Sequence, residues 1–154
     1  MKVGIITIQD NSNYGNRLQN YAVSKIIDSF REVTKGKIIT IIGCGGDRDP
    51  KKRPIMGSIA SENSDFVVFT NDNPRTEDEK KIMEDILNGV KKDNYIVVHD
   101  RRDAIKKGLE LLNDNDTLLI LGKGHEDYQI IGREKVHLSD KEEVYKFINR
   151  TIDN

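Results

Sequence analysis

Short aliphatic, β-branched runs alternate with amphipathic segments along almost the whole chain, and this alternation restricts the possible folds more than any other feature. The runs end in turn-forming residues, as buried strands do, and lie at 3–8, 38–42, 66–70, 95–98 and 117–121. Between them, apolar residues recur at the three- and four-residue spacing of helices. Strands that alternate with helices form parallel sheets with right-handed crossovers. The chain is therefore predicted to be an α/β protein, a three-layer Rossmann-like domain with a mostly parallel sheet.

Residues typical of helix ends refine this architecture. The first helix is predicted over about 15–35, and Gly36 is expected to end it in the left-handed conformation. Thr76 with Glu79 matches a capping box at the start of another helix. Asp100 is expected to cap the helix that follows the fourth strand.

The carboxyl-terminal third adds a second, smaller element. Segments 128–131 and 135–138 flank Gly132-Arg133-Glu134, a pattern that predicts a small hairpin. A length of 154 residues suits one domain, and no linker or internal repeat divides the chain. We therefore expect residues 1–154 to form a single domain that carries the hairpin beside its sheet.

Charge and cysteine content exclude several classes of partner. Lys and Arg number 25 against 26 Asp and Glu, so the balance offers no electrostatic basis for binding nucleic acid or an anionic membrane. No apolar run approaches the roughly 20 residues of a membrane span. The single cysteine, Cys44, suits a reducing compartment. We expect a cytoplasmic protein without nucleic-acid or membrane partners.

Three polar loops follow predicted strands and form the candidate site. They are 43–49, 72–75 and 122–129, the last with the sequence Gly-Lys-Gly-His-Glu-Asp-Tyr-Gln. Ligands of open α/β sheets bind outside the carboxyl ends of the strands. The three loops are therefore expected to meet around a small polar ligand.

Several features within these loops have an ordinary structural explanation as well as a functional one. The glycines at 43–46 could cradle a phosphate or simply provide a tight exit from a strand. No GxxxxGK[ST] sequence is present, so tight nucleotide triphosphate binding is not expected. His125 lacks a second histidine or cysteine at ligand spacing, so we expect no metal site. The run 51–53 is interpreted as a solvated basic loop, and Tyr14, Tyr21, Tyr95 and Tyr145 as core residues.

The charged residues of the loops suggest what kind of ligand would fit. Arg48 and Arg75 are suited to gripping a carboxylate through paired hydrogen bonds, although both could be solvated surface residues. Glu126 could accept hydrogen bonds from an ammonium group or could serve as a local cap. With Asn73, this set complements a zwitterionic amino acid.

Three motifs in the same order resemble the carboxy-terminal domain of the MurE-type Mur ligases. They are GCGGDRDPKKRPIMG (43–57), SDFVVFTNDNPRTED (64–78) and LGKGHEDYQI (121–130), and the resemblance extends over about 24–152. These enzymes are ATP-dependent acid–amino-acid ligases of peptidoglycan synthesis. They join an amino acid, meso-diaminopimelate in the branch with a DNPR motif, to UDP-MurNAc-L-Ala-D-Glu.

The resemblance implies a particular set of substrate-binding residues. Asn73 and the two arginines would hold the distal carboxylate of meso-diaminopimelate, and Glu126 with the Gly122 carbonyl would hold its distal ammonium. The full set carried over by motif is Arg48, Asp72, Asn73, Pro74, Arg75, Gly122 and Glu126. No catalytic residue and no metal ligand is expected among these residues.

The resemblance covers only the third of the three domains of such an enzyme. ATP and Mg²⁺ would be bound by the central domain of the family, so we expect no cofactor on this domain alone and no activity of the isolated chain. The central and amino-terminal domains could act in trans; the alternatives are a stand-alone diaminopimelate- or muropeptide-binding module, or a relic without function. Residues 1–22 resemble the start of a polysaccharide pyruvyl transferase-type protein and are expected to supply a foreign strand and half-helix that complete the sheet.

Overall fold

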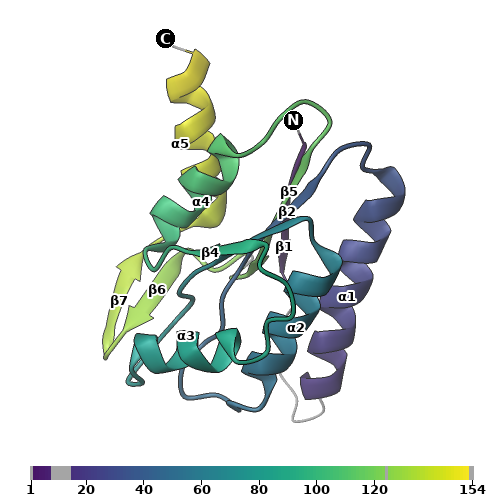
Figure 1. Cartoon of the computed structure of the whole chain (residues 1–154). Helices are drawn as coiled ribbons and strands as arrows, with labels where there is room; N and C mark the ends of the chain where they lie inside the picture. The colour runs from purple at the N-terminus through teal and green to yellow at the C-terminus, as the bar shows by residue number, and fades with distance from the viewer. Residues whose placement is uncertain (1, 8–14, 124, 153–154) are drawn as a thin grey trace.

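A five-stranded parallel sheet forms the centre of the molecule (Figure 1). The computed structural model describes residues 2–7, 15–123 and 125–152. Within these ranges the strands lie side by side in the order β1-β5-β2-β3-β4. Their bounds are β1 (Lys2–Thr7), β2 (Ile38–Ile42), β3 (Phe66–Phe69), β4 (Tyr95–Val97) and β5 (Thr117–Gly122). The predicted α/β architecture with its parallel sheet is confirmed; Ile8 and the predicted loop after it lie outside the described residues.

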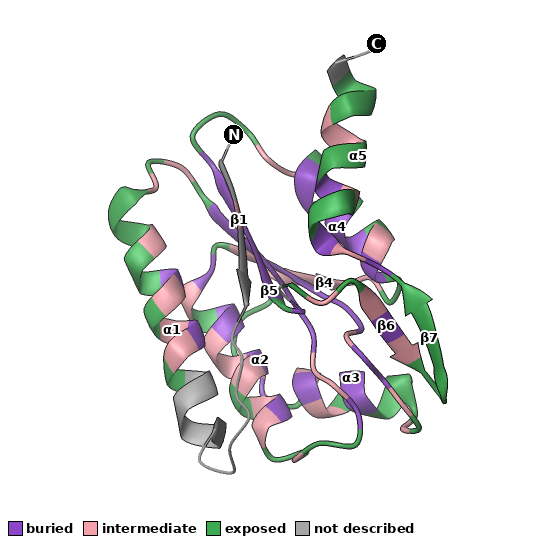
Figure 2. Ribbon diagram, turned by 180° about the vertical axis from the view of Figure 1, so that it is seen from behind, coloured by how far each residue is buried: buried purple, intermediate pink, exposed green. Residues whose placement is uncertain are grey.

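Helices cover both faces of the sheet, which gives the predicted three layers (Figures 1 and 2). One face packs against α1 (Gly15–Val33), α2 (Lys52–Asn63) and α3 (Glu79–Leu87). The other packs against α4 (Arg101–Glu110) and α5 (Asp140–Ile152). The hairpin, β6 (Tyr128–Ile131) and β7 (Glu134–His137), is antiparallel and lies apart from the main sheet, as predicted.

Alternate residues of each strand point to opposite faces, so the sheet has two hydrophobic cores. In β5, Leu119 and Leu121 belong to the core under α1 to α3, whereas Leu118 and Ile120 belong to the core under α4 and α5. All four side chains are fully buried. Burial on both faces explains why the strands read as continuous aliphatic runs rather than as alternating ones.

Capping was predicted correctly at one helix and incorrectly at another. The Asp100 carboxylate accepts hydrogen bonds from the backbone N–H groups of Arg102 and Asp103, so it caps α4. The cap of α3 is Asp78, not Thr76, because the Thr76 hydroxyl is instead bonded to the Asp47 carboxylate at 3.0 Å. A long-range contact therefore displaced the local capping pattern.

Gly36 and two tyrosines also differ from expectation. Gly36 has no left-handed φ; its N–H donates to the Asn115 carbonyl at 3.0 Å, and a Cβ there would overlap the Asp116 carboxylate. Tyr21 and Tyr145 are exposed on helix surfaces rather than in the core. Tyr95 packs edge-on against Phe69, whereas Tyr14 lies outside the described residues.

Candidate functional site

The strand order brings the three predicted loops to one edge of the sheet. β2 lies between β5 and β3, with Ile41 opposite Ile120 and Ile42 opposite Phe69. Because these neighbouring strands are parallel, their carboxyl ends open at the same edge. Loops 43–49, 72–75 and 122–129 therefore adjoin one another, as the sequence predicted.

The glycine-rich loop packs directly against the loop after β3. The Gly46 N–H donates to the Asn73 carbonyl at 2.9 Å. A Cβ on Gly46 would overlap the Pro74 carbonyl oxygen, and one on Gly43 would overlap the Thr70 carbonyl oxygen. These glycines are required by the close approach of two backbones, so the tight-exit interpretation of 43–46 holds rather than the open phosphate cradle.

The hairpin supports the other side of the same loop. The Arg75 N–H donates to the Ile130 carbonyl at 3.0 Å, and the Arg75 carbonyl accepts from the Gly132 N–H at 2.7 Å. The Gln129 side-chain amide donates to the Asp72 carbonyl at 2.5 Å. Loop 72–75 is thus held between the glycine-rich loop and β6, which makes it a rigid platform.

Arg75 has the backbone conformation expected of a strained functional position. Its φ is 54°, in the left-handed region that non-glycine residues seldom adopt. The two backbone hydrogen bonds to the hairpin hold it there. Its guanidinium Nη1 donates to the Gly46 carbonyl at 2.8 Å, so the side chain lies over the glycine-rich loop.

Arg48 comes near Arg75 at Gly45. A Cβ on Gly45 would lie 2.8 Å from Arg75 Nη1 and 3.8 Å from Arg48 Cγ. Arg48 is exposed and Arg75 is half-buried. Both predicted arginines therefore lie beside Gly45.

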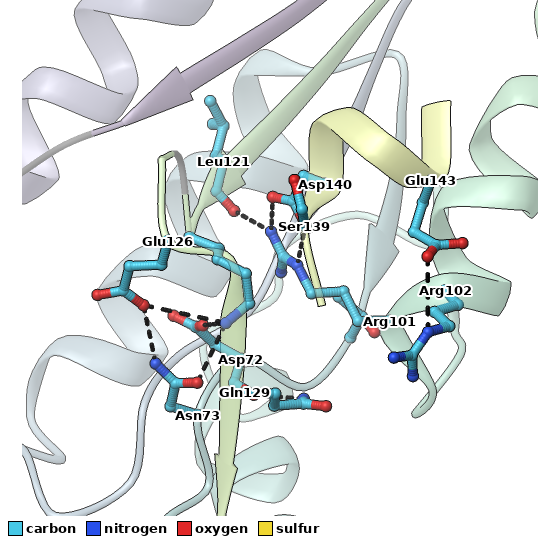
Figure 3. Close-up of polar contacts among 12 residues, drawn as sticks. Asp72, Asn73, Arg101, Arg102, Leu121, Glu126, Gln129, Ser139, Asp140 and Glu143 are labelled. Carbon is cyan, nitrogen blue, oxygen red and sulfur yellow. Dashed lines mark hydrogen bonds and ion pairs between the residues drawn. The ribbon is translucent and has the colours of Figure 1, made fainter. Parts of the chain in front are cut away.

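Asn73 and Glu126 come from different loops and bond directly to each other. The Asn73 Nδ2 donates to Glu126 Oε2 at 3.0 Å (Figure 3). Asn73 is buried, whereas the Glu126 side chain keeps 35% of its surface exposed. Gly122, with a φ of 111°, lies beside Asp72, because a Cβ on Gly122 would be 3.6 Å from Asp72 Oδ2. Pro74 is buried within the same loop.

Lys123 is a buried cation that sequence reasoning did not assign to the site. Its Nζ donates to Asn73 Oδ1 at 3.1 Å and to the Tyr128 carbonyl, and lies 3.6 Å from Asp72 Oδ1. Burial lowers the pKa of this ammonium, while the carboxylates of Asp72 and Glu126 act in the opposite direction. Its place between two glycines directly after a buried strand was the signal that could have identified it.

Arg53 corrects the expectation that 51–53 is a solvated loop. Arg53 lies in α2 with only 1% of its side chain exposed. Its guanidinium donates two 2.6 Å hydrogen bonds to the Glu77 carboxylate, and further bonds to Asp85 at 2.9 Å and to the Gly45 carbonyl at 3.3 Å. These bonds raise the pKa of Arg53 and lower that of Glu77. The residue anchors the glycine-rich loop rather than facing solvent.

A second buried arginine lies behind the site. Arg101 pairs with Asp140 through two 2.8 Å hydrogen bonds and donates to the Leu121 carbonyl at 3.2 Å (Figure 3). Both side chains are fully buried. This pair joins α4 and α5 to the end of β5, where the motif of loop 122–129 begins.

The remaining candidate groups show little sign of reactivity. Burial, aided by Asp72, raises the pKa of the Cys44 thiol to about 12, so its thiolate is scarce at neutral pH. His125 is exposed. Within the described ranges, no three His, Cys, Asp or Glu side chains gather as metal ligands would. No helix in those ranges is long and apolar enough to cross a membrane.

Comparison with known proteins gives the family. The family model described as "Mur ligase, glutamate ligase domain" matches residues 20–124. The chain belongs to the Mur ligase family. The resemblance inferred from the three motifs is thereby confirmed.

Curated Mur ligases extend the similarity beyond the family model. The chain is 47% identical over 146 residues to the UDP-N-acetylmuramoyl-L-alanyl-D-glutamate–2,6-diaminopimelate ligase of Clostridium botulinum, covering 95% of the chain and 29% of that relative. The ligase of the same name from Haemophilus ducreyi is 48% identical over 130 residues, covering 84% and 26%. The longer alignment reaches into the segment 1–22. The chain spans less than a third of the length of these relatives.

A solved structure shares the whole fold. The structure of a UDP-N-acetylmuramoyl-L-alanyl-D-glutamate–2,6-diaminopimelate ligase superposes with a TM-score of 0.85 at 31% identity, over 98% of this chain and 30% of that one. The three loops described above therefore belong to a Mur ligase fold.

Proposed function

We propose that this Mur ligase domain binds meso-diaminopimelate at the edge where loops 43–49, 72–75 and 122–129 meet. It would serve as the amino-acid-binding domain of a ligase that adds this amino acid to UDP-MurNAc-L-Ala-D-Glu. The observation that carries the proposal is the 3.0 Å hydrogen bond between Asn73 and Glu126. It joins two sequence motifs 53 residues apart, and one of the two loops that it connects also carries Arg75.

The cationic side of the site suits the distal carboxylate of the ligand. Arg75 uses Nη1 to hold Gly46, and among the described residues no acceptor bonds to its Nη2 or Nε. Those two nitrogens can form the paired hydrogen bonds that a guanidinium makes with a carboxylate. Arg48, which is exposed and also lies beside Gly45, would add a second positive charge.

The anionic side suits the distal ammonium. Glu126 is partly exposed, so its carboxylate can accept from a ligand while Asn73 keeps it in place. The Gly122 carbonyl, at the end of β5, would be the second acceptor. A ligand held by charge at its distal end leaves its other amino group free for amide formation.

The domain's contribution to ligation would be positioning. The free amino group of meso-diaminopimelate attacks an acyl phosphate of the glutamyl residue in this type of reaction. Holding two reactants in the correct geometry can supply roughly 7–11 kcal/mol of the barrier in favourable cases. In this proposal, Arg48, Arg75, Asn73 and Glu126 bind and orient the amino acid and transfer no proton or group themselves.

The residues of this domain do not fit an ATP and Mg²⁺ site. The chain has no GxxxxGK[ST] sequence. The space beside Gly43 and Gly46 is occupied by the neighbouring backbone and is not open to a phosphate. We therefore assign ATP and Mg²⁺ to a Mur ligase central domain, which would act with this chain and with an amino-terminal domain that holds the nucleotide substrate.

Residues 1–22 are proposed to belong to the same folding unit. β1 pairs with β5 along its whole length, from Lys2 opposite Thr117 to Thr7 opposite Gly122. This pairing supports a role in completing the sheet, and it places the end of β1 beside the first residue of the third loop. A foreign origin of this segment, as its sequence suggests, remains a prediction.

Affinity measurements on matched variants test the binding site. Isothermal titration calorimetry with meso-diaminopimelate compares the wild-type chain with Arg75→Ala and Glu126→Gln, and uses Arg133→Ala in the exposed hairpin turn as the control. We expect each site variant to lose about tenfold or more in affinity, because a hydrogen bond to a charged group is removed, and the control to match the wild type. Wild-type affinity in Arg75→Ala would contradict the site assignment.

A further inference from the structure

The buried ammonium of Lys123 lies beneath the site and is surrounded by oxygen atoms. Its side chain is fully buried, although lysine is among the residues least often found inside proteins. The nearest acceptors are the Tyr128 carbonyl and Asn73 Oδ1, the latter at 3.1 Å. Asp72 Oδ1 at 3.6 Å and Glu126 Oε2 at 3.9 Å lie farther away.

These distances show how Lys123 acts on Glu126. A separation of 3.9 Å is too long for a hydrogen bond, so Lys123 does not hold the Glu126 carboxylate directly. Glu126 is held by the Asn73 amide. The hydrogen-bonded connection from Lys123 to Glu126 therefore passes through the Asn73 side chain, and the direct contact between them is a long ion pair.

Two donors determine which way the Asn73 amide points. Its Oδ1 accepts from Lys123 Nζ at 3.1 Å and from the Ile130 N–H at 3.0 Å. With the oxygen occupied in this way, the Nδ2 group faces Glu126 and can only donate. Without Lys123, the oxygen keeps one partner and the amide loses its strongest constraint, since bonds to charged groups are stronger than neutral ones.

We propose that Lys123 is a positioning residue that determines ligand specificity. It orients the Asn73 amide and thereby holds the Glu126 carboxylate where it can bind an ammonium group of the ligand. This inference rests on the proposed function, because it concerns the same ligand site. Asp72 supports the arrangement: its Oδ1 is buried without a hydrogen bond and is compensated by the Lys123 charge.

A different role for Lys123 would have the opposite consequence. If its charge merely offset that of Glu126, removing it would strengthen the attraction of Glu126 for a ligand ammonium. If Lys123 positions Asn73, removing it weakens that attraction. The sign of the change in selectivity therefore separates the two roles.

Two ligands isolate the ammonium interaction. They are meso-diaminopimelate and 2-aminopimelate, which has the same carbon chain and both carboxylates but lacks one amino group. The ratio of their affinities measures how much the distal ammonium group contributes to binding. It is determined for the wild type, for Lys123→Met, for Lys123→Arg, and for Lys80→Met, a control at an exposed lysine of α3.

The expected result is a selective loss. Lys123→Met should lower the ratio of affinities by about tenfold, mainly through weaker binding of meso-diaminopimelate. Lys123→Arg, which restores a charged donor, should recover part of the ratio, and Lys80→Met should leave it unchanged. An unchanged or raised ratio in Lys123→Met overturns the proposal, as does an equal loss of affinity for both ligands, which a merely structural role predicts.

An NMR measurement without ligand tests the role of Lys123 independently of the proposed function. If the wild-type chain binds neither ligand, the function proposed above fails, but the side-chain amide signals of Asn73 in ¹⁵N-correlated NMR spectra still report its hydrogen bonds. A shift of these signals in Lys123→Met supports the orienting role, and unchanged signals refute it. If Lys123→Met does not fold, as near-ultraviolet circular dichroism would show, Lys123→Gln replaces it with the same expected outcomes.

Discussion

Replacing Arg53 by methionine should remove the strongest anchor beneath the glycine-rich loop. The substitution keeps most of the buried aliphatic stem but deletes four hydrogen bonds, three of them to the carboxylates of Glu77 and Asp85. Breaking a buried ion pair by removing one partner typically costs about 3–5 kcal/mol. The partner side chains are 28% and 22% exposed, so water can solvate them in part. We therefore expect a loss near the lower end, about 3 kcal/mol.

Urea denaturation at pH 7 measures this loss, and a double-mutant cycle assigns its cause. Because the cost comes largely from an unpaired carboxylate, Glu77→Gln in the Arg53→Met background should recover part of the stability. Arg102→Met is the matched control: Arg102 is 40% exposed and lies 3.6 Å from Glu143, so its loss should cost less than about 1 kcal/mol.

Arg53→Met should also weaken ligand binding, although Arg53 is not one of the proposed ligand-binding residues. Glu77 accepts a hydrogen bond from the Asp47 N–H at 3.0 Å, and the Asp47 carboxylate bonds to Thr76. Releasing Glu77 therefore loosens both loops that carry the site's arginines. A loss of stability below about 1 kcal/mol in Arg53→Met, or full additivity in the cycle, would show that these ion pairs do not anchor the glycine-rich loop.

Three further perturbations test other parts of the structure. Asp116 accepts hydrogen bonds from the N–H groups of Lys37 and Asn113, and these bonds lower its pKa. The contribution of Asp116 to folding stability is therefore present above the ordinary carboxyl pKa and is lost as pH falls through the lowered value. Asp116→Asn should therefore destabilise by roughly 1.5–3 kcal/mol at pH 7. The difference in urea denaturation should begin to shrink as pH falls below 3.8, and a gap that stays constant as the pH is lowered further would contradict this prediction. Gly46→Ala should force the loop away from Pro74, lowering the melting temperature and the affinity for meso-diaminopimelate, whereas a wild-type melting temperature would count against the described packing. Deleting 1–22 should uncover the edge of β5 and speed hydrogen exchange of its amides; unchanged exchange would show that β1 contributes nothing to the sheet.

The strands and the meeting of the loops could be predicted from the sequence because both follow from local patterns. Aliphatic runs such as 117–121 reveal buried strands, and a parallel sheet brings their carboxyl ends together. The position of Arg48, Arg75 and Glu126 after strands therefore sufficed to place them near one edge.

The buried charges could not be predicted in the same way. Arg53, Arg101 and Lys123 would ordinarily be placed on the surface, and the partners that justify their burial are 24, 39 and 50 residues away in sequence. Periodicity carries no information about contacts at such separations. The Asp47–Thr76 bond had the same effect on the predicted cap of α3, because a distant partner outcompeted the local one.

The most direct test of the proposed ligand site is a two-dimensional amide NMR titration of the 154-residue chain with meso-diaminopimelate, with lysine as the control ligand. Lysine keeps both amino groups but lacks the distal carboxylate that Arg48 and Arg75 would bind. We expect saturable shifts confined to loops 43–49, 72–75 and 122–129 with meso-diaminopimelate, and much weaker shifts with lysine. A well-dispersed spectrum that meso-diaminopimelate leaves unchanged, or shifts located away from these loops, would contradict it.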